Sequence, residues 1–223
     1  MTLLHPPYTV WHLSYVAIGA ALAPRFHGGL LALTALAFFL ALGVGAHALD
    51  ELHGRPLGTR IPARMLVALA ATTIAGAAGI GVGVAVTRNL WLVLFVAFGT
   101  FIAVAYNLEL FGGRFHNDAW FAIAWGAFPL VTAYFVSAGT IDTQAVLAGA
   151  FAALLSHAQR LLSAPVREVR RRVAAVSGTI LLEDGRSRTI DSGTLTGAPE
   201  QALRTLAAAV VTLAAALVTF RVT

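Results

Sequence analysis

The stretch GLLALTALAFFLALGVGAHALDELHGRPLGTRIP, residues Gly29–Pro62, decides the fold of this chain. It opens with an uncharged apolar run, Gly29–Ala46, whose length is typical of a helix that crosses a membrane. His47, Asp50 and Glu51 then follow at spacings of three and four residues, which places them on one helical face. Charged groups at the end of a spanning helix usually meet water, a metal ion or a substrate. The stretch therefore predicts a spanning helix that ends in a polar site, or, alternatively, in an ordinary polar loop.

The composition of the whole chain is that of a polytopic membrane protein. Of its 223 residues, 58% are hydrophobic and 11% are charged, whereas a soluble domain carries about 25% charged residues. Cysteine is absent, which excludes disulfides, thiolate metal sites and cysteine nucleophiles. All fifteen basic residues are arginine, so a lysine Schiff base is excluded as well. We interpret the net charge of +5 as contact with anionic lipid or phosphate, and not with nucleic acid.

Seven apolar segments predict an all-α bundle of about seven transmembrane helices in a single domain, residues 1–223. The segments are Thr9–Ala23, Gly29–Leu49, Ala63–Val86, Leu90–Tyr106, Ala119–Ala138, Thr143–Leu162 and Pro199–Val222. The first segment is short and partly polar, and its aromatic residues favour an interfacial position.

The arginines predict how the bundle is oriented. Twelve of the fifteen lie in or beside the connections that follow the second, fourth and sixth segments, and three lie on the opposite side. Cytoplasmic loops carry the excess of arginine. We therefore expect an integral protein of the plasma membrane with a cytoplasmic N-terminus and an external C-terminus.

A polar insertion of about residues 163–198 separates the last two segments. It opens with the basic run APVREVRRRVAAV, Ala164–Val176, which favours a separate surface helix. Two short runs, Thr179–Leu182 and Ser187–Ile190, then flank Asp184-Gly185, a turn signal of β-hairpins. The sequence predicts a small cytoplasmic β-hairpin here, and a disordered loop is the alternative.

Three polar clusters fall at the predicted cytoplasmic ends of the helices, where they would line one cavity. They are His47, Asp50, Glu51 and His53; Tyr106, Asn107 and Glu109 with Arg114, His116, Asn117 and Asp118; and Ser156, His157, Gln159 and Arg160. Carboxylates at a phosphate site suit Mg²⁺, which bridges to substrate oxygens. Carboxylates mixed with imidazoles also suit Zn²⁺, Mn²⁺ or Fe²⁺.

This layout resembles the UbiA-type intramembrane prenyltransferases. Their first motif, N-D-x-x-D-x-x-x-D, corresponds to Ala46–Gly54, in which Asp50 matches the central aspartate, and Arg55-Pro56-Leu57 follows as in the family. Tyr106 matches the Tyr of the family's Tyr-Ser motif. The second aspartate motif corresponds to Ser156–Arg160, which contains no aspartate.

The resemblance implies a helical bundle that transfers an isoprenoid from an allylic diphosphate to an acceptor, with Mg²⁺ as the cofactor. The implied metal ligands are Asp50, Glu51 and His47. The implied phosphate-binding residues are Arg55, Arg60 and Arg160, and the implied lining of the catalytic site is Asp50, Glu51, Tyr106 and His157.

Three interpretations of the function follow. The leading one is a divergent prenyltransferase-like protein that acts on or binds an isoprenoid or other lipid phosphate. The second is a non-catalytic membrane scaffold or lipid-binding subunit. The third is a metal-dependent membrane enzyme with His47, Asp50, Glu51 and His157 as ligands. The expected partners are an isoprenoid or other lipid substrate and membrane lipids, without nucleic acid; a homo- or hetero-oligomer is left open.

Overall fold

The computed structural model describes residues 6–223, and helices dominate this range. The helical elements are α1 (Pro6–Leu22), α2 (Gly28–Phe38), η1 (Phe39–Gly45), α3 (Ala46–Leu52), α4 (Ala63–Thr87), α5 (Leu92–Asn107), α6 (Asp118–Phe121), η2 (Ala122–Ala127), α7 (Phe128–Ala138), α8 (Thr143–Arg172) and α9 (Ser192–Val222). The elements η1 and η2 are π-helical turns. They continue their neighbours without a break, so α2–η1–α3 and α6–η2–α7 are each one long helix.

Each of the seven predicted apolar ranges is helical. Five helices are long and apolar enough to cross a membrane, namely Gly28–Leu52, Ala63–Thr87, Asp118–Ala138, Thr143–Arg172 and Ser192–Val222. Helix α5 is a shorter apolar helix, and α1 has 17 residues. Large apolar side chains on the outside, such as Leu154 and Phe220, are exposed, as lipid-facing residues are. The chain is thus a predominantly helical protein whose long apolar helices are compatible with a membrane.

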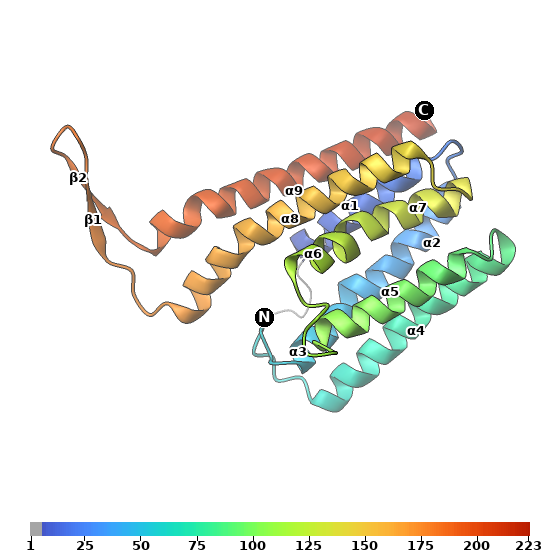
Figure 1. Cartoon of the computed structure of the whole chain (residues 1–223), viewed down its shortest axis with the longest axis horizontal. Coiled ribbons are helices and arrows are strands. Elements are labelled where there is room, and N and C mark those ends of the chain that lie inside the picture. Colours follow the sequence, from blue (N-terminus) through green and yellow to red (C-terminus); the bar gives the residue numbers. More distant parts are fainter. Residues whose placement is uncertain (1–5) are drawn as a thin grey trace.

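Successive long helices run antiparallel and side by side (Figure 1). Helix α1 lies in the middle and packs against α7 and α9, while α8 packs against η2 and α9. On the other side, α4 packs against η1 and α5. The ends of α3 and α5 and the starts of α1, α4 and α6 consequently lie at one end of the bundle, beyond which α8 and α9 project. We call this end the hairpin end.

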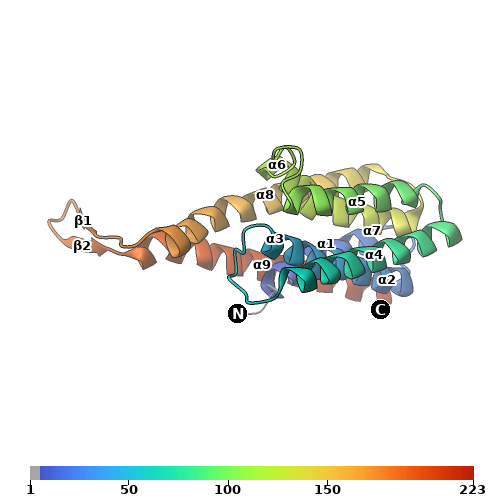
Figure 2. The same ribbon diagram turned by 90° about the horizontal axis from the view of Figure 1, so that it is seen from below.

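The predicted β-hairpin is confirmed. Strands β1 (Gly178–Leu181) and β2 (Ser187–Ile190) pair antiparallel, and Gly185 in the turn has a φ of 82°. The hairpin lies at the tip of a long projection from the bundle (Figures 1 and 2). We call this projection, residues 163–198, the arm.

Two helix boundaries differ from the prediction. The basic run Ala164–Val176 is not a separate surface helix, because α8 continues through Pro165 to Arg172. Helix α9 begins at Ser192 and not at Pro199, because the Asp191 carboxylate and the Thr194 backbone and hydroxyl form a capping box there. Both helices therefore extend into the arm, and the irregular part of the predicted insertion is shorter than expected.

The aromatic residues of α1 are in the core and not at an interface. The exposed fraction of Trp11 is 2% and that of Tyr15 is 0%. Their polar atoms are satisfied internally, because the Trp11 indole N–H donates to the Tyr15 hydroxyl at 2.6 Å and the Ser156 hydroxyl donates to the same oxygen at 3.2 Å. Polar aromatic side chains in an apolar helix can thus signal a buried hydrogen-bond partner as well as a membrane surface.

Candidate functional site

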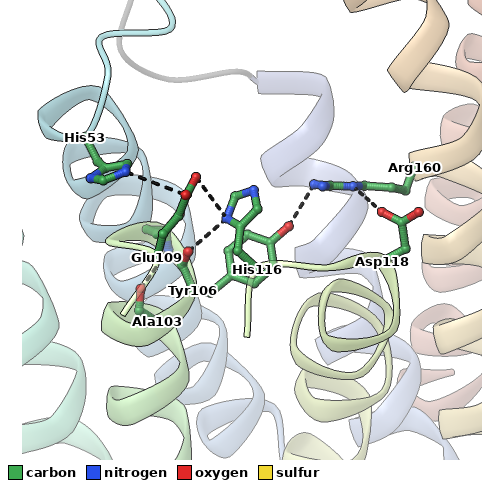
Figure 3. A network of polar contacts seen from close by, with 8 residues as sticks. His53, Ala103, Tyr106, Glu109, His116, Asp118 and Arg160 are labelled. Carbon is green, nitrogen blue, oxygen red and sulfur yellow. Dashed lines mark hydrogen bonds and ion pairs between the residues drawn. The ribbon is translucent and has the colours of Figure 1, made fainter. Parts of the chain in front are cut away.

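The three polar clusters predicted from the sequence do meet at the hairpin end. Figure 3 shows a chain of polar contacts that runs from His53 through Glu109, His116 and Tyr106 to Arg160. It joins the end of α3 to the end of α5, and the end of α5 to α8. The connection is made by side chains that are far apart in sequence, so the clusters form one site and not three separate loop surfaces.

Arg160 is the residue through which α8 takes part in this site. Its Nε donates to the Asp118 carboxylate at 2.8 Å, and its Nη1 donates to the Tyr106 hydroxyl at 2.7 Å. The guanidinium carbon also lies 5.3 Å from the centre of the Phe121 ring, a distance typical of a cation–π contact. Only 21% of the side chain is exposed. These contacts fix the guanidinium in one orientation while part of it remains open to solvent.

Tyr106 holds the centre of the site through its ring. The ring stacks on His116 with centres 4.4 Å apart and contacts Trp125 at the same separation. His116 is held in turn by its Nδ1, which lies 2.9 Å from the Tyr106 carbonyl oxygen. Glu109 reaches His53 at 3.8 Å and His116 at 3.9 Å. Such exposed pairs contribute little energy, so packing around Tyr106 is the stronger constraint.

Each of the two loops beside this cluster contains non-glycine residues in a strained backbone conformation. In the described part of the chain, the non-glycine residues with positive φ are Arg55, Glu109 and Phe111. All three lie in the connections after α3 and α5. Strained backbone of this kind costs about 1–3 kcal/mol per residue and gathers at functional sites. This observation supports a functional role for the hairpin end.

Glu51 supports the loop after α3. Its side chain is completely buried, and its two carboxylate oxygens accept hydrogen bonds from the Leu57 and Thr59 amides at 2.9 and 2.7 Å. Arg55 completes this loop, since its Nη1 donates to the Thr59 and Ile61 carbonyls. Both side chains therefore have a structural task here, in addition to the metal and phosphate roles predicted for them.

Asp50 and His47 lie closer to the polar cluster than Glu51 does. Asp50 is half-buried and lies within electrostatic reach of His47, His116 and Arg171. The Nδ1 of His47 lies 2.9 Å from the Leu42 carbonyl oxygen in η1. A carbonyl only accepts, so Nδ1 carries the proton. The acceptor lies in a π-helical turn, an element that is frequent at functional sites.

Helix α1 contributes two residues that the sequence did not predict for the site. The Tyr8 ring packs against His12 and His47, and Tyr8 lies within electrostatic reach of Arg160 and Asp50. The Nδ1 of His12 lies 2.6 Å from the Trp125 carbonyl oxygen in η2. Its buried Nε2 has no hydrogen-bond partner among residues 6–223. The first helix therefore lies against the site, which its apolar pattern gave no means of predicting.

The remaining predicted residues are more peripheral. Arg60 is exposed and lies beside Pro62 and Met65 in the loop before α4. His157 is half-buried on α8, one turn before Leu161. No contact in the described structure links Arg60 or His157 to the Tyr106–Arg160 pair. Their predicted roles stay predictions.

The predicted Mg²⁺ site requires His, Asp or Glu side chains that are close enough together to act as metal ligands. Within residues 6–223, no three His, Asp or Glu side chains lie close enough together to hold a metal ion. Both Glu51 oxygens already accept amide hydrogen bonds. These residues do not form a complete Mg²⁺ site by themselves, and ligand oxygens would have to supply most of the coordination.

An apolar cavity of about 90 Å³, partly open to the outside of the bundle, lies below the polar cluster. On the same measure a single water needs roughly 10–15 Å³, so this is more than a packing defect. Residues of α2, η1, α4, α5, η2 and α7 line it, and they include Leu42, Ala78, Gly99, Ile102 and Ala124. Ile102 is one helical turn from Tyr106, and both belong to the same buried aromatic cluster. The cavity-lining Ile102 thus lies about one helical turn from the polar site.

Comparisons of this chain with family models, with curated proteins and with solved structures found no match.

Proposed function

We propose that this chain is a UbiA-like membrane protein that binds an isoprenoid or other lipid phosphate. The phosphate would lie at the hairpin end and the hydrocarbon chain in the apolar cavity. The observation that carries the proposal is Arg160, held by Asp118 and Tyr106 at the polar end of that cavity. The seven apolar segments and the arginine asymmetry support seven spanning segments, of which α1 and α5 are the short ones.

Arg160 is suited to a phosphate by its geometry. A guanidinium has five N–H donors in a fixed fork, and the contacts to Asp118 and Tyr106 use two of them. The rest remain for a ligand whose oxygens match the fork. Because the side chain is already oriented, little conformational freedom is lost when the ligand binds.

The cavity supports a hydrocarbon chain as the other half of the ligand. Its lining is apolar except for threonine side chains, and apolar cavities of this kind do not hold ordered water well. Of the helices that line it, α2–η1, α4 and η2–α7 belong to candidate membrane spans, and α5 is a shorter apolar helix. A lipid with an anionic head can therefore place its tail among η1, α4 and α5 while the head meets Arg160.

Both the leading interpretation, a prenyltransferase-like protein, and its alternative, a non-catalytic scaffold or lipid-binding subunit, require that the protein binds the lipid phosphate. Prenyl transfer additionally needs an acceptor and neutralisation of the leaving diphosphate, for which the resemblance implies Mg²⁺ on Asp50. The amide contacts of Glu51 favour binding over metal-dependent transfer. Release of diphosphate from farnesyl diphosphate by the purified protein with Mg²⁺, dependent on an added acceptor that becomes farnesylated, would decide for the transferase.

The binding test uses farnesyl phosphate and the thermal stability of the detergent-solubilised protein. We expect farnesyl phosphate to raise the Tm of the wild type, and Arg160→Gln to reduce this rise. Ala78→Leu fills the cavity and should also reduce it. Ala75→Leu is the matched control, because Ala75 is exposed on the same helix and does not line the cavity. Equal responses from all four proteins would refute the proposed site.

The orientation is tested separately. The arginine asymmetry places the hairpin end in the cytoplasm of a plasma-membrane protein. The chain lacks cysteine, so single-cysteine variants report cleanly. Ser187→Cys in β2 should react with an impermeant maleimide from the cytoplasmic side, and Thr140→Cys, between α7 and α8, from outside. The reverse pattern would place the phosphate site on the external face.

A further inference from the structure

The hairpin at the tip of the arm leaves one edge of strand β1 unpaired. In the described part of the chain the sheet has two strands, so β1 is hydrogen-bonded to β2 on one side alone. The Leu182 N–H donates to the Arg186 carbonyl at 2.8 Å, and opposite residues in an antiparallel pair alternate between bonded and non-bonded positions. Thr179 and Leu181 are therefore non-bonded positions of the register, and their backbone N–H and C=O groups point to the free edge.

This free edge carries none of the usual protection against pairing. Natural edge strands are commonly protected by charged side chains or proline. Strand β2 follows this rule, since it contains Arg188 and is preceded by Arg186. The ten residues Val173–Leu182 contain neither a charge nor a proline, and 76% of Leu181 is exposed. The edge of β1 is thus open to the addition of a strand.

The charges of the hairpin indicate which strand fits this edge. An acidic or basic strand would find no opposite charge on β1, whereas an uncharged strand loses no ion pair there. A second copy of β1 is uncharged over its whole length, and its outward backbone groups at Thr179 and Leu181 match those of the first. Two β2 strands, in contrast, would bring Arg188 of both copies together, and like charges across strands are destabilising.

Two β1 strands fit each other in antiparallel orientation about a two-fold axis at Ile180. Thr179 of one copy then lies opposite Leu181 of the other, and each of these pairs exchanges two backbone hydrogen bonds. Ile180 meets its own counterpart in a non-bonded pair, where side chains come closest. Gly178 lies opposite Leu182 of the second copy and leaves room for its side chain. The contact is self-complementary, as an interface between identical chains has to be.

The arm can bring two such edges together on one side of a membrane. Figure 1 shows that the hairpin turns away from the direction of α8 and α9 instead of continuing it. Two arms that project from the same side can therefore approach each other with their β1 strands antiparallel. Confinement of both copies to one bilayer raises their effective concentration, so a short interface is enough for association.

We propose that two copies of this chain associate through β1 and form one continuous antiparallel sheet of four strands between their arms. The inference goes beyond the proposed function and does not depend on lipid-phosphate binding. An isolated two-stranded hairpin is marginally stable in water, and a sheet of more strands is more stable. Pairing also places the exposed Leu181 beside Thr179 of the second copy.

The first experiment is disulfide cross-linking of the full-length protein in lipid vesicles, because the chain has no native cysteine. At the two-fold axis the two Ile180 Cα atoms would be about 4.5 Å apart, within the range of a disulfide. The two Leu181 Cα atoms would be roughly 9 Å apart, beyond that range. Mild oxidation should therefore convert Ile180→Cys mainly into a linked dimer and leave Leu181→Cys and the β2 control Thr189→Cys mainly monomeric.

A second variant removes the pairing without disturbing the hairpin. Leu181→Pro deletes an N–H that β2 does not use and that the second copy needs, and proline is tolerated at such edge positions. In the Ile180→Cys background it should abolish the cross-link. Thr189→Pro is the matched control, because it makes the same change at the free edge of β2, and it should leave the cross-link intact. Protection of residues 178–191 from protease reports that the hairpin persists in both variants.

The proposal is overturned if Ile180→Cys and Thr189→Cys cross-link equally, because mobile hairpins that collide at random would do so. It is also overturned if the cross-link persists in Leu181→Pro with the hairpin intact. Absence of any cross-link in Ile180→Cys would exclude the second copy and leave the edge to a strand of another protein. None of these results bears on lipid-phosphate binding, which Arg160→Gln tests separately.

Discussion

The bundle is stabilised by close packing between helices, whereas the hairpin of the arm is stabilised by local turn and capping interactions. In the bundle, helices approach so closely that glycine is required: a Cβ on Gly19 would collide with the Leu130 backbone, and one on Gly126 would lie 2.5 Å from the Ala152 carbonyl oxygen. In the arm, the hairpin is exposed on both strands and depends on local features, the turn at Gly185 and the cap at Asp191. Contacts between distant residues decide the first region, and near neighbours decide the second.

The largest effect should come from adding one methyl group in the bundle. In Gly19→Ala the new Cβ meets backbone atoms of α7, which cannot rotate away, so α1 and α7 must separate. Overpacking of this kind typically costs about 1–3 kcal/mol, which corresponds to a fall in Tm of roughly 2–12 °C for a chain of this length. The measurement is thermal unfolding in detergent.

Gly79→Ala is the control, because a Cβ there meets no atom within 4 Å. Its Tm should be equal to that of the wild type or higher. A Tm of Gly19→Ala that is unchanged as well would show that the packing of α1 on α7 is looser than described.

A comparable effect is expected at Glu51 in α3, at the hairpin end of the bundle. Glu51→Gln replaces one accepting oxygen by an NH₂ group that faces the Leu57 or Thr59 amide. The loss of charge-assisted bonds to a buried group costs about 1.5–3 kcal/mol. We expect a lower Tm and faster proteolysis of residues 53–62. Asp50→Asn, one residue away and half-buried, should leave both quantities nearly unchanged; equal losses would assign Asp50 a structural role too.

A smaller and purely local effect is expected in the hairpin. Gly185 has a φ of 82°, a conformation that costs a β-branched residue roughly 1–2 kcal/mol. Gly185→Val should increase proteolysis within residues 178–191 and leave the Tm of the bundle unchanged. Gly185→Asn should restore most of the protection, because Asn tolerates positive φ. Loss of bundle stability in Gly185→Val would show that arm and bundle unfold together.

The smallest effect concerns the start of α9. Hydrogen bonds from the Thr194 backbone and hydroxyl lower the pKa of Asp191 below its usual value of 3.8. The folded pKa is depressed, so this cap stabilises α9 above the unfolded pKa and is lost as the pH falls through the folded value. Protection factors at Ser192–Leu195, which are corrected for the intrinsic exchange rate at each pH, should therefore fall below about pH 4. Asn also caps helices well but does not titrate, so Asp191→Asn should remove the pH dependence.

Much of the fold was predictable because its signals are local. Apolar runs of sufficient length specify helices in any surroundings without water, and all seven predicted ranges are helical. The Asp184-Gly185 turn likewise predicted the hairpin, since turn chemistry involves a few consecutive residues. The end of α8 was missed because the basic run Ala164–Val176 was interpreted as a surface helix of its own, whereas α8 continues through it to Arg172.

The sequence by itself determined which residues gather at one end of the bundle, because alternating spans bring every second helix end to the same side. The sequence also predicted Tyr106 and Arg160 as site residues, but it did not predict that they contact each other. Tertiary structure alone decided that Glu51 faces the loop amides while its neighbour Asp50 faces the polar cluster. It also brought Tyr8 and His12 of α1 beside residues over a hundred positions away, such as Trp125. The physical reason is that the pattern of a helix specifies which residues share a face, whereas the neighbour that each face meets is specified only by packing.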